Sequence, residues 1–188
     1  MSMISSPQDI QNSLLEWFGD NGRHWIPWKL KPDGSIPRSG ESISPYEIWI
    51  AEVMLQQTQL KVVIPYWEKW MREFPNLTYL AKADLENVLL IWQGLGYYSR
   101  ANRIHQASKI LIDLIGVNRD DDPYCWPNGI DQWMSLPGIG RSTAGSIVSP
   151  AFDLPASILD GNVKRIFSRL FAVRKSSIND EKNCGDIV

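Results

Sequence analysis

The chain has 188 residues, of which 44% are hydrophobic and 21% charged, so it can form one domain, or two small domains that share a core, and is not globally disordered. No uninterrupted apolar run of about 18 residues exists, which excludes a transmembrane helix. The two cysteines exclude a disulfide framework and a four-cysteine metal site, and the net charge of −2 is unusual for a protein that binds nucleic acid.

Hydrophobic periodicity predicts helices nearly throughout the chain. The first covers 8–19, and an exposed loop rich in Pro, Gly and Ser follows over 29–42. Ser44 is expected to cap the next helix, with Pro45 at its first position and Glu47 completing a capping box. That helix is expected to end at about Gln57.

The remaining helices are predicted from the same periodicity and from Pro and Gly breaks. They lie between Pro65 and Pro75, over 83–92 before Gly94, from about Tyr98 to Ile115, near 129–135, over 141–149 and over 161–172, with a loop at 120–123. No pattern of period two persists, so the predicted fold class is all-α. Most of the nine tryptophans are assigned to the core.

Charge is distributed unevenly along the chain. Residues 99–109 contain Arg100, Arg103 and Lys109 without an acid, and 160–175 contains five basic residues and one acid, Asp160. This pattern predicts a basic face opposite an acidic one. A mixed, solvated surface explains the charges alone equally well.

The segment Leu136–Ala144, with the sequence LPGIGRSTA, places two glycines one residue apart between two predicted helices. Glycine allows a positive φ and close approach of another backbone, and the start of the second helix offers free N–H groups that suit a phosphate. LPG alone is equally compatible with an ordinary tight helix–helix turn. The full segment, followed by a helix of small residues, predicts a helix-hairpin-helix.

Two carboxylates are candidates for chemistry. Asp160 lies where a loop enters the last predicted helix, so it is an N-cap, a catalytic carboxylate, or both. Glu52 is flanked by apolar residues, which predicts desolvation, a raised pKa and a proton donor near neutral pH. The alternative for Glu52 is a surface glutamate on an amphipathic helix. The polar run 56–59 indicates that this helix end faces a hydrogen-bonding partner.

Taken together, six segments resemble the helix-hairpin-helix DNA glycosylase superfamily, and within it the adenine DNA glycosylases of the MutY type, which remove adenine mispaired with 8-oxoguanine. The segments are GRHWIPW (22–28), PYEIWIAEVMLQQTQ (45–59), VIPYWEKW (63–70), WQGLGYYSRA (92–101), LPGIGRSTAGSIV (136–148) and ILDGNVKR (158–165). They follow the family order and cover about 8–173.

The resemblance implies an enzyme that flips adenine out of the duplex and hydrolyses its N-glycosidic bond. By this analogy Glu52 is the general acid, Asp160 stabilises the oxocarbenium-like sugar, and Asn162 orients Asp160 or a water. The resemblance implies that Gln57 and Tyr97 enter the duplex as wedges, with Thr58 beside them. It implies that a DNA phosphate binds at Gly138, Gly140 and Ser142. The residues implied to line the adenine pocket are Arg23, Trp28, Leu55 and Leu60. No metal site is expected.

Ser142 distinguishes two kinds of relative. Bifunctional relatives of the endonuclease III type carry a lysine at this position, and its amine attacks the sugar. A serine cannot form a Schiff base, so the resemblance implies a monofunctional glycosylase that leaves the abasic site uncut.

The resemblance also implies two modules. Residues 29–159 correspond to a six-helix module with the helix-hairpin-helix at 136–149, and 1–28 with 160–188 correspond to part of a second module. In the family that module carries a 4Fe–4S cluster on four cysteines, which are absent here, because Cys184 has no second cysteine nearby. We therefore expect no cofactor in this chain and a truncated or interrupted gene product, with Ile166 and Phe167 partly exposed.

Three functions remain open from the sequence. The first is a monomeric adenine glycosylase that acts on double-stranded DNA with adenine opposite 8-oxoguanine or guanine. The second is a catalytically weak or inactive DNA-binding remnant of such an enzyme, and the third is a helical scaffold that binds a protein partner through its tryptophans. No signal peptide or membrane partner is predicted, and the expected location is the cytoplasm, in association with DNA.

Overall fold

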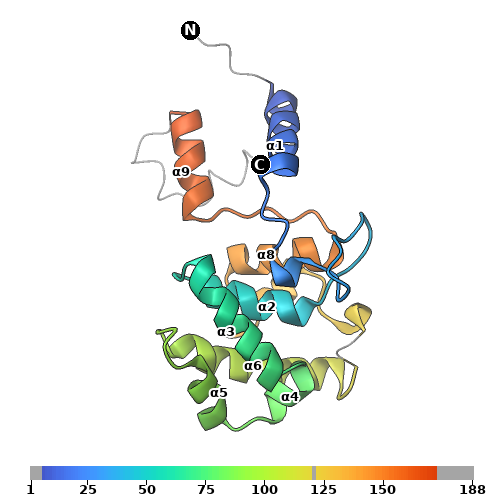
Figure 1. Cartoon of the computed structure of the whole chain (residues 1–188), viewed down its shortest axis with the longest axis vertical. Coiled ribbons are helices and arrows are strands. Elements are labelled where there is room, and N and C mark those ends of the chain that lie inside the picture. Colours follow the sequence, from blue (N-terminus) through green and yellow to red (C-terminus); the bar gives the residue numbers. More distant parts are fainter. Residues whose placement is uncertain (1–5, 120–121, 173–188) are drawn as a thin grey trace.

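The computed structural model describes residues 6–119 and 122–172, and within these ranges it contains helices and no strand (Figure 1). Its elements are α1 (Pro7–Asn21), η1 (Pro27–Lys29), α2 (Pro45–Leu55), α3 (Leu60–Glu73), α4 (Leu77–Lys82), α5 (Leu85–Trp92), α6 (Ser99–Ile115), η2 (Pro123–Cys125), α7 (Ile130–Met134), α8 (Arg141–Phe152) and α9 (Gly161–Leu170), where η denotes a 3₁₀ turn. The all-α prediction is confirmed. The first two residues of the predicted loop at 120–123 lie outside the described residues.

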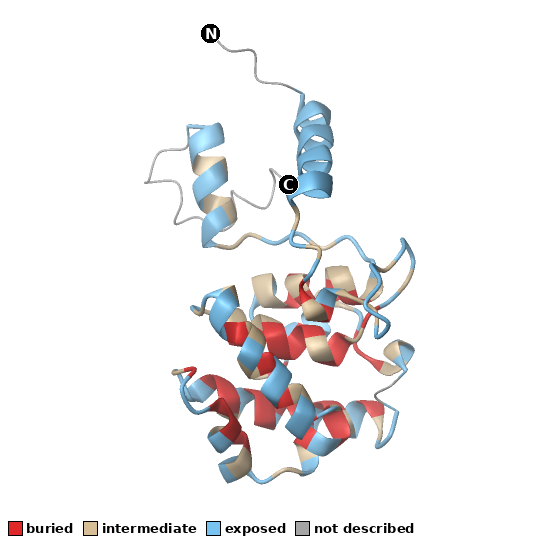
Figure 2. Cartoon of the chain, viewed as in Figure 1, coloured by how far each residue is buried: buried red, intermediate tan, exposed pale blue. Residues whose placement is uncertain are grey.

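Helices α2 to α8 form one bundle. Helix α2 packs against η1, α3, α6 and α8, while α4 and α5 pack against α6 and α7 packs against α8. Figure 1 shows α1 and α9 beyond one end of this bundle, each joined to it by a non-helical segment. Burial follows the same division, because the buried residues in Figure 2 are concentrated in the bundle, and α1 and α9 contain none.

The core of the bundle is rich in tryptophan. The buried tryptophans are Trp28, Trp49, Trp67, Trp70, Trp92, Trp126 and Trp133. Their rings contact one another: the ring centroids of Trp70 and Trp92 are 5.7 Å apart, and those of Trp126 and Trp133 are 6.0 Å apart. Only Trp17 and Trp25 are exposed. The assignment of most tryptophans to the core is confirmed, which leaves few of them for a partner surface.

Helix starts follow the local sequence signals. Ser6 and Asp9 form a capping box before α1. The Ser44 hydroxyl accepts a hydrogen bond from the Glu47 N–H at 3.2 Å, and Pro45 occupies the first helical position. The second half of the capping box predicted for Glu47 is not formed, because the Glu47 side chain lines a hollow instead.

Two predicted boundaries differ from the structure, and one helix was not predicted. Helix α3 begins at Leu60 and contains Pro65, because the buried face formed by Val63, Trp67 and Trp70 continues through the proline and outweighs its lost hydrogen bond. Helix α4, which Asn76 caps by accepting from the Tyr79 N–H, is absent from the predicted elements. Helix α2 stops at Leu55, since Gln57 has a φ of 61° and cannot continue it.

The predicted basic stretch 99–109 does not form a uniform surface. Arg103 and Lys109 are exposed, but Arg100 is only 5% exposed and lies inside the bundle. Helix periodicity explains the difference, because residue 100 falls on the same buried face as Ile104 and Ala107. Among the described helices, none is long and apolar enough to cross a membrane.

Candidate functional site

An open hollow of about 620 Å³ lies where three distant segments meet. The segments are the end of α2 with the turn after it, the start of α8, and the entry to α9. The lining residues are Glu52, Leu55, Gln56, Gln57, Thr58, Gln59, Ser142, Thr143, Ser146, Ile158, Asp160 and Asn162. Both candidate carboxylates therefore line one hollow, together with the polar run 56–59 and the hairpin serine.

Glu52 is held on the α2 turn that also buries Trp49 and Val53. Burial raises the pKa of the Glu52 carboxyl, while the charge of Lys29 and a hydrogen bond from Ser146 act in the opposite direction without cancelling it. The predicted desolvation is thus present. A carboxyl with a raised pKa is protonated in a larger fraction of molecules near neutral pH and can donate that proton to a bound group.

Asp160 is the N-cap of α9. Its carboxylate accepts a hydrogen bond from the Val163 N–H at 2.8 Å and one from the Asn162 side-chain amide at 3.4 Å. The predicted capping role is confirmed. The same carboxylate also lines the hollow, so the cap orients a negative charge toward the space beside Glu52.

The hairpin between α7 and α8 depends on two different glycines. Gly138 has a φ of 83°, and a Cβ there would meet the Arg103 side chain at 2.8 Å. Gly140 has an ordinary φ of −93°, caps α8 without a side-chain hydrogen bond, and would have nothing within 4 Å of a Cβ. The N-terminus of α8 is therefore open, which is the arrangement that binds an anion such as a phosphate.

Gln56 links two of the segments that surround the hollow. The sequence-based assignment gave it no role. Its side-chain amide donates to the Gly138 carbonyl at 3.4 Å and to the Thr143 hydroxyl at 3.3 Å. It thereby ties the end of α2 to the hairpin. The polar run 56–59 drew attention to this segment, but the partner of each glutamine depends on tertiary structure.

Several residues assigned from the resemblance lie outside the hollow. Trp28 is 1% exposed and packs against Trp67, with ring centroids 5.4 Å apart, and its indole N–H has no hydrogen-bond partner. Arg23 is exposed beside a separate hollow of about 260 Å³, and Leu60 packs against the core. Tyr97 is 64% exposed on the loop between α5 and α6. Among the four residues assigned to the adenine pocket, only Leu55 lines the hollow.

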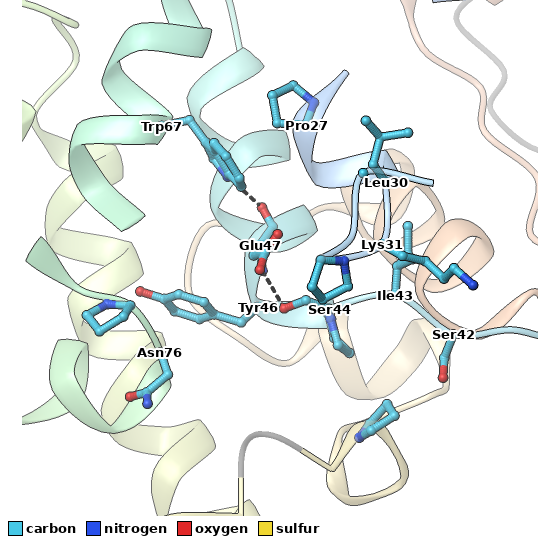
Figure 3. Close-up of a pocket in the computed structure, with 15 residues that line it drawn as sticks. Pro27, Leu30, Lys31, Ser42, Ile43, Ser44, Tyr46, Glu47, Trp67 and Asn76 are labelled. Carbon is cyan, nitrogen blue, oxygen red and sulfur yellow. Dashed lines mark hydrogen bonds between the residues drawn. The ribbon is translucent and has the colours of Figure 1, made fainter. Parts of the chain in front are cut away.

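A second hollow of about 610 Å³ lies at the start of α2 (Figure 3). Its walls include Tyr46, Trp67 and several prolines, and the Trp67 indole donates to the Glu47 backbone carbonyl at 3.0 Å. Among the described residues that line it, Glu47 is the only carboxylate, and burial raises the pKa of that carboxyl. Glycoside hydrolysis generally uses two carboxylates, so the hollow that contains Glu52 and Asp160 is the better candidate active site.

The described residues do not fit a four-thiolate cluster. They contain no group of three or more His, Cys, Asp or Glu that could hold a metal ion. Cys125 is a free thiol and Cys184 lies outside the described residues. No chemical step below depends on a cluster.

Comparison with known proteins identifies the family. The model of the HhH-GPD superfamily base excision DNA repair proteins matches residues 50–184. The chain belongs to this superfamily. Residues 50–184 of the HhH-GPD match include Glu52, the hairpin and Asp160, which are the parts that form the hollow.

Similar proteins support the resemblance to adenine DNA glycosylases. An adenine DNA glycosylase of Buchnera aphidicola subsp. Baizongia pistaciae is 40% identical over 171 residues, covering 90% of this chain and 43% of the relative. One from Buchnera aphidicola subsp. Schizaphis graminum is 39% identical over 160 residues, covering 85% and 41%. The chain thus spans less than half the length of these curated relatives.

A solved structure shows the same fold. A non-covalent endonuclease III–DNA complex matches with a TM-score of 0.69 and 26% identity, covering 98% of this chain and 78% of the other. The predicted helix-hairpin-helix glycosylase fold is confirmed.

Proposed function

We propose that this HhH-GPD protein is a monofunctional adenine DNA glycosylase that hydrolyses the N-glycosidic bond of adenine opposite 8-oxoguanine or guanine. The observation that carries the proposal is the shared hollow, in which a half-buried carboxyl with a raised pKa, Glu52, lies with the capping carboxylate Asp160. The adenine DNA glycosylases among its relatives support adenine as the excised base, and the endonuclease III–DNA complex among its structural relatives supports DNA as the substrate.

The two carboxylates have different tasks in this proposal. Adenine leaves a sugar readily only when the departing base is protonated, and Glu52 is the group able to donate that proton. The sugar then develops positive charge, which the ionised Asp160 stabilises. Water adds to the sugar carbon and gives up one proton to the Glu52 carboxylate, which regenerates the acid, so that the products are free adenine and an abasic site. Extrusion of the base from the stack must precede these steps, because an enzyme cannot reach a base inside the duplex.

DNA would be held at the rim of the hollow. The open N-terminus of α8 suits a backbone phosphate, and Ser142 lies at its first turn. Gln57 and Tyr97 lie on exposed turns, from which their side chains can enter the duplex beside the mispair. We assign the protein to an intracellular, DNA-associated role as a monomer.

We also propose the modular division implied by the resemblance. Residues 29–159 would form the six-helix module, and α1 and α9 would belong to a second module. The support is burial, since both helices extend from the bundle without a buried residue.

The decisive experiment is single-turnover excision on a duplex with adenine opposite 8-oxoguanine. Glu52→Gln keeps the size and hydrogen-bonding capacity of the side chain but removes the proton, and we expect excision to fall by at least about 100-fold. A wild-type chain that binds the duplex but releases no adenine would instead identify the DNA-binding remnant. Binding that does not weaken as salt rises would contradict phosphate contact and favour the scaffold function.

The monofunctional assignment has its own test. Borohydride traps the Schiff base of a lyase as a covalent adduct, and Ser142 offers no amine at that position. We expect no adduct above background with the wild-type chain and a detectable adduct with Ser142→Lys. Efficient trapping by the wild-type chain would contradict the assignment.

A further inference from the structure

Arg100 is a buried arginine whose hydrogen bonds join two loops. It lies in the first turn of α6 and is 5% exposed. One terminal nitrogen, Nη1, donates to the carbonyls of Val53 at 3.0 Å, Met54 at 2.8 Å and Gln56 at 2.6 Å. These acceptors belong to the end of α2 and the residue after it.

The other terminal nitrogen of Arg100 reaches both loops. Nη2 donates to the Thr58 hydroxyl at 3.2 Å and to the carbonyls of Leu95 and Gly96, each at 3.4 Å. The last carbonyls of a helix lack intrahelical donors, and the guanidinium supplies a donor to the Met54 carbonyl and a further donor to the Val53 and Gln56 carbonyls. A planar guanidinium can donate hydrogen bonds to acceptors in both loops at once, whereas a lysine ammonium cannot.

The two loops share an unusual backbone conformation. Gln57 has a φ of 61° and Tyr97 a φ of 49°. Each residue follows directly after an Arg100 acceptor, Gln56 in one loop and Gly96 in the other. A left-handed backbone is unfavourable for a residue with a side chain and persists only where the surroundings impose it.

The surroundings of Arg100 contain rings and carbonyls and no acid. The guanidinium carbon lies 5.2 Å from the Trp92 ring centroid and 5.6 Å from that of Tyr97. Among the described residues the one ion pair joins Lys31 and Glu41, so no carboxylate neutralises Arg100. Its charge is therefore balanced by the dipoles of the carbonyls and the hydroxyl that it contacts.

We propose that Arg100 is a positioning residue that fixes the turns of Gln57 and Tyr97 as one unit and thereby sets the recognition of a mispaired duplex, without taking part in the chemistry. This inference rests on the proposed function, which supplies the duplex. It adds a separate claim: the two turns, although 40 residues apart in the sequence, become ordered or disordered as one unit.

The test compares Arg100→Lys with Arg72→Lys, a control at an exposed arginine for which no ion pair or hydrogen bond is present in the structure. We expect Arg100→Lys to weaken binding to the mispaired duplex at least 10-fold more than binding to a matched duplex. We also expect the single-turnover rate at saturating duplex to stay within about 3-fold of wild type. Equal weakening on both duplexes, or a lower saturated rate with unchanged discrimination, would overturn the proposal.

Hydrogen exchange tests the same claim without DNA. The Thr58 N–H donates to the Leu55 carbonyl and the Leu95 N–H to the Trp92 carbonyl, so each loop has an amide that reports its order. In Arg100→Lys we expect both amides to lose protection from hydrogen exchange, while the amides of α3 keep their protection. Loss in one loop alone would contradict coupling. If wild type neither excises adenine nor distinguishes duplexes, the proposed function fails, and the exchange result still decides the role of Arg100.

If Arg100→Lys fails to fold, the wild-type chain still tests the proposal. In the wild-type chain, the Thr58 and Leu95 amides should then exchange through one opening, with the same free energy and the same dependence on urea. Two different openings would overturn the proposal.

Discussion

Glu52 and Glu47 lie five residues apart on α2 and share one physical property. Burial raises the pKa of both carboxyls, but Glu52 lines a hollow together with Asp160, whereas no other described carboxylate lines the hollow of Glu47. Each charge is held in a desolvated place that the unfolded chain does not impose, so each costs stability near neutral pH. In the proposed function, Glu52 has a chemical use that accounts for this cost, and Glu47 has none.

The matched pair Glu52→Gln and Glu47→Gln separates activity from stability. We expect both variants to unfold at a higher temperature than wild type at pH 7 to 8. Glu52→Gln should lose excision by about 100-fold or more, whereas Glu47→Gln should keep it. Thermal unfolding and single-turnover excision on the same preparations measure both effects. Loss of excision in Glu47→Gln would move the candidate active site to the other hollow.

The pH dependence of these stabilities has a definite sign. As pH falls, a carboxyl with a raised pKa takes up its proton in the folded state before it does so in the unfolded state, so protonation stabilises the fold. The advantage of either glutamine variant over wild type should therefore be largest above the raised folded pKa of the carboxyl and shrink on acidification. Unfolding midpoints measured from pH 8 to pH 4 test this, and an advantage that grows toward low pH would refute the assigned cause.

Excision should follow the same titration. Only molecules with protonated Glu52 can donate to the departing base, so the single-turnover rate is expected to fall as pH rises through the raised pKa of Glu52. The rate is measured at saturating duplex, because binding has its own pH dependence. A rate that is flat from pH 5 to pH 9 would argue against Glu52 as the proton donor.

Residues differ in how far the sequence predicts them. The environment of Glu52 is predictable, because its apolar neighbours on one helix turn are visible in the sequence. The role of Arg100 is not, because its acceptors are mostly backbone carbonyls, which every residue has, and three of them lie more than 40 positions away in the sequence. Helix periodicity separates Arg100 from the exposed Arg103, but the partners of Arg100 depend on tertiary packing.

At the scale of elements, the hairpin contains a natural control. Gly138 requires a left-handed backbone and Gly140 does not, although both belong to one LPGIG segment. Gly138→Ala is expected to destabilise the fold by about 1–2 kcal/mol, because alanine disfavours that φ and its methyl group displaces Arg103. Chemical denaturation measures this loss.

Gly140→Ala tests what approaches the hairpin from outside. A methyl group at 140 meets nothing in the free protein, so the stability cost should stay below about 1 kcal/mol. A phosphate at the start of α8 would meet that methyl group, and we expect duplex affinity to fall more than stability does. Unchanged affinity in Gly140→Ala would place the DNA backbone elsewhere.

The elements were predicted well where signals are local and poorly where they are tertiary. Caps at Ser44 and Asp160 are short-range features, and both are present. The wrong start at Pro65 has a different origin, because a proline normally ends a helix and here the buried tryptophans of α3 outweigh it. Helix α4 has six residues, which is too short for a clear periodic pattern.

For the whole molecule, the buried core lies in the bundle, and α1 and α9 differ from the bundle in having exposed apolar side chains but no buried residue. The exposed apolar side chains of α1 and α9 include Leu14, Leu15, Trp17, Phe18 and Ile166. The expected exposure of Ile166 and partial exposure of Phe167 are confirmed, and Phe167 pairs with Phe171, with ring centroids 5.8 Å apart. Exposed apolar faces of this kind favour self-association as concentration rises.

Two leucine variants measure this division. Leu80 is fully buried in α4 and Leu15 is 70% exposed in α1, so the same change to alanine meets opposite environments. Leu80→Ala should cost about 2–5 kcal/mol, because it leaves a cavity in the bundle. Leu15→Ala should change the free energy of unfolding by less than about 0.5 kcal/mol and should lower self-association in light scattering. If Leu15→Ala lowered the free energy of unfolding about as much as Leu80→Ala, α1 would be part of the core in solution. Only a buried leucine makes enough contacts for its truncation to cost that much stability.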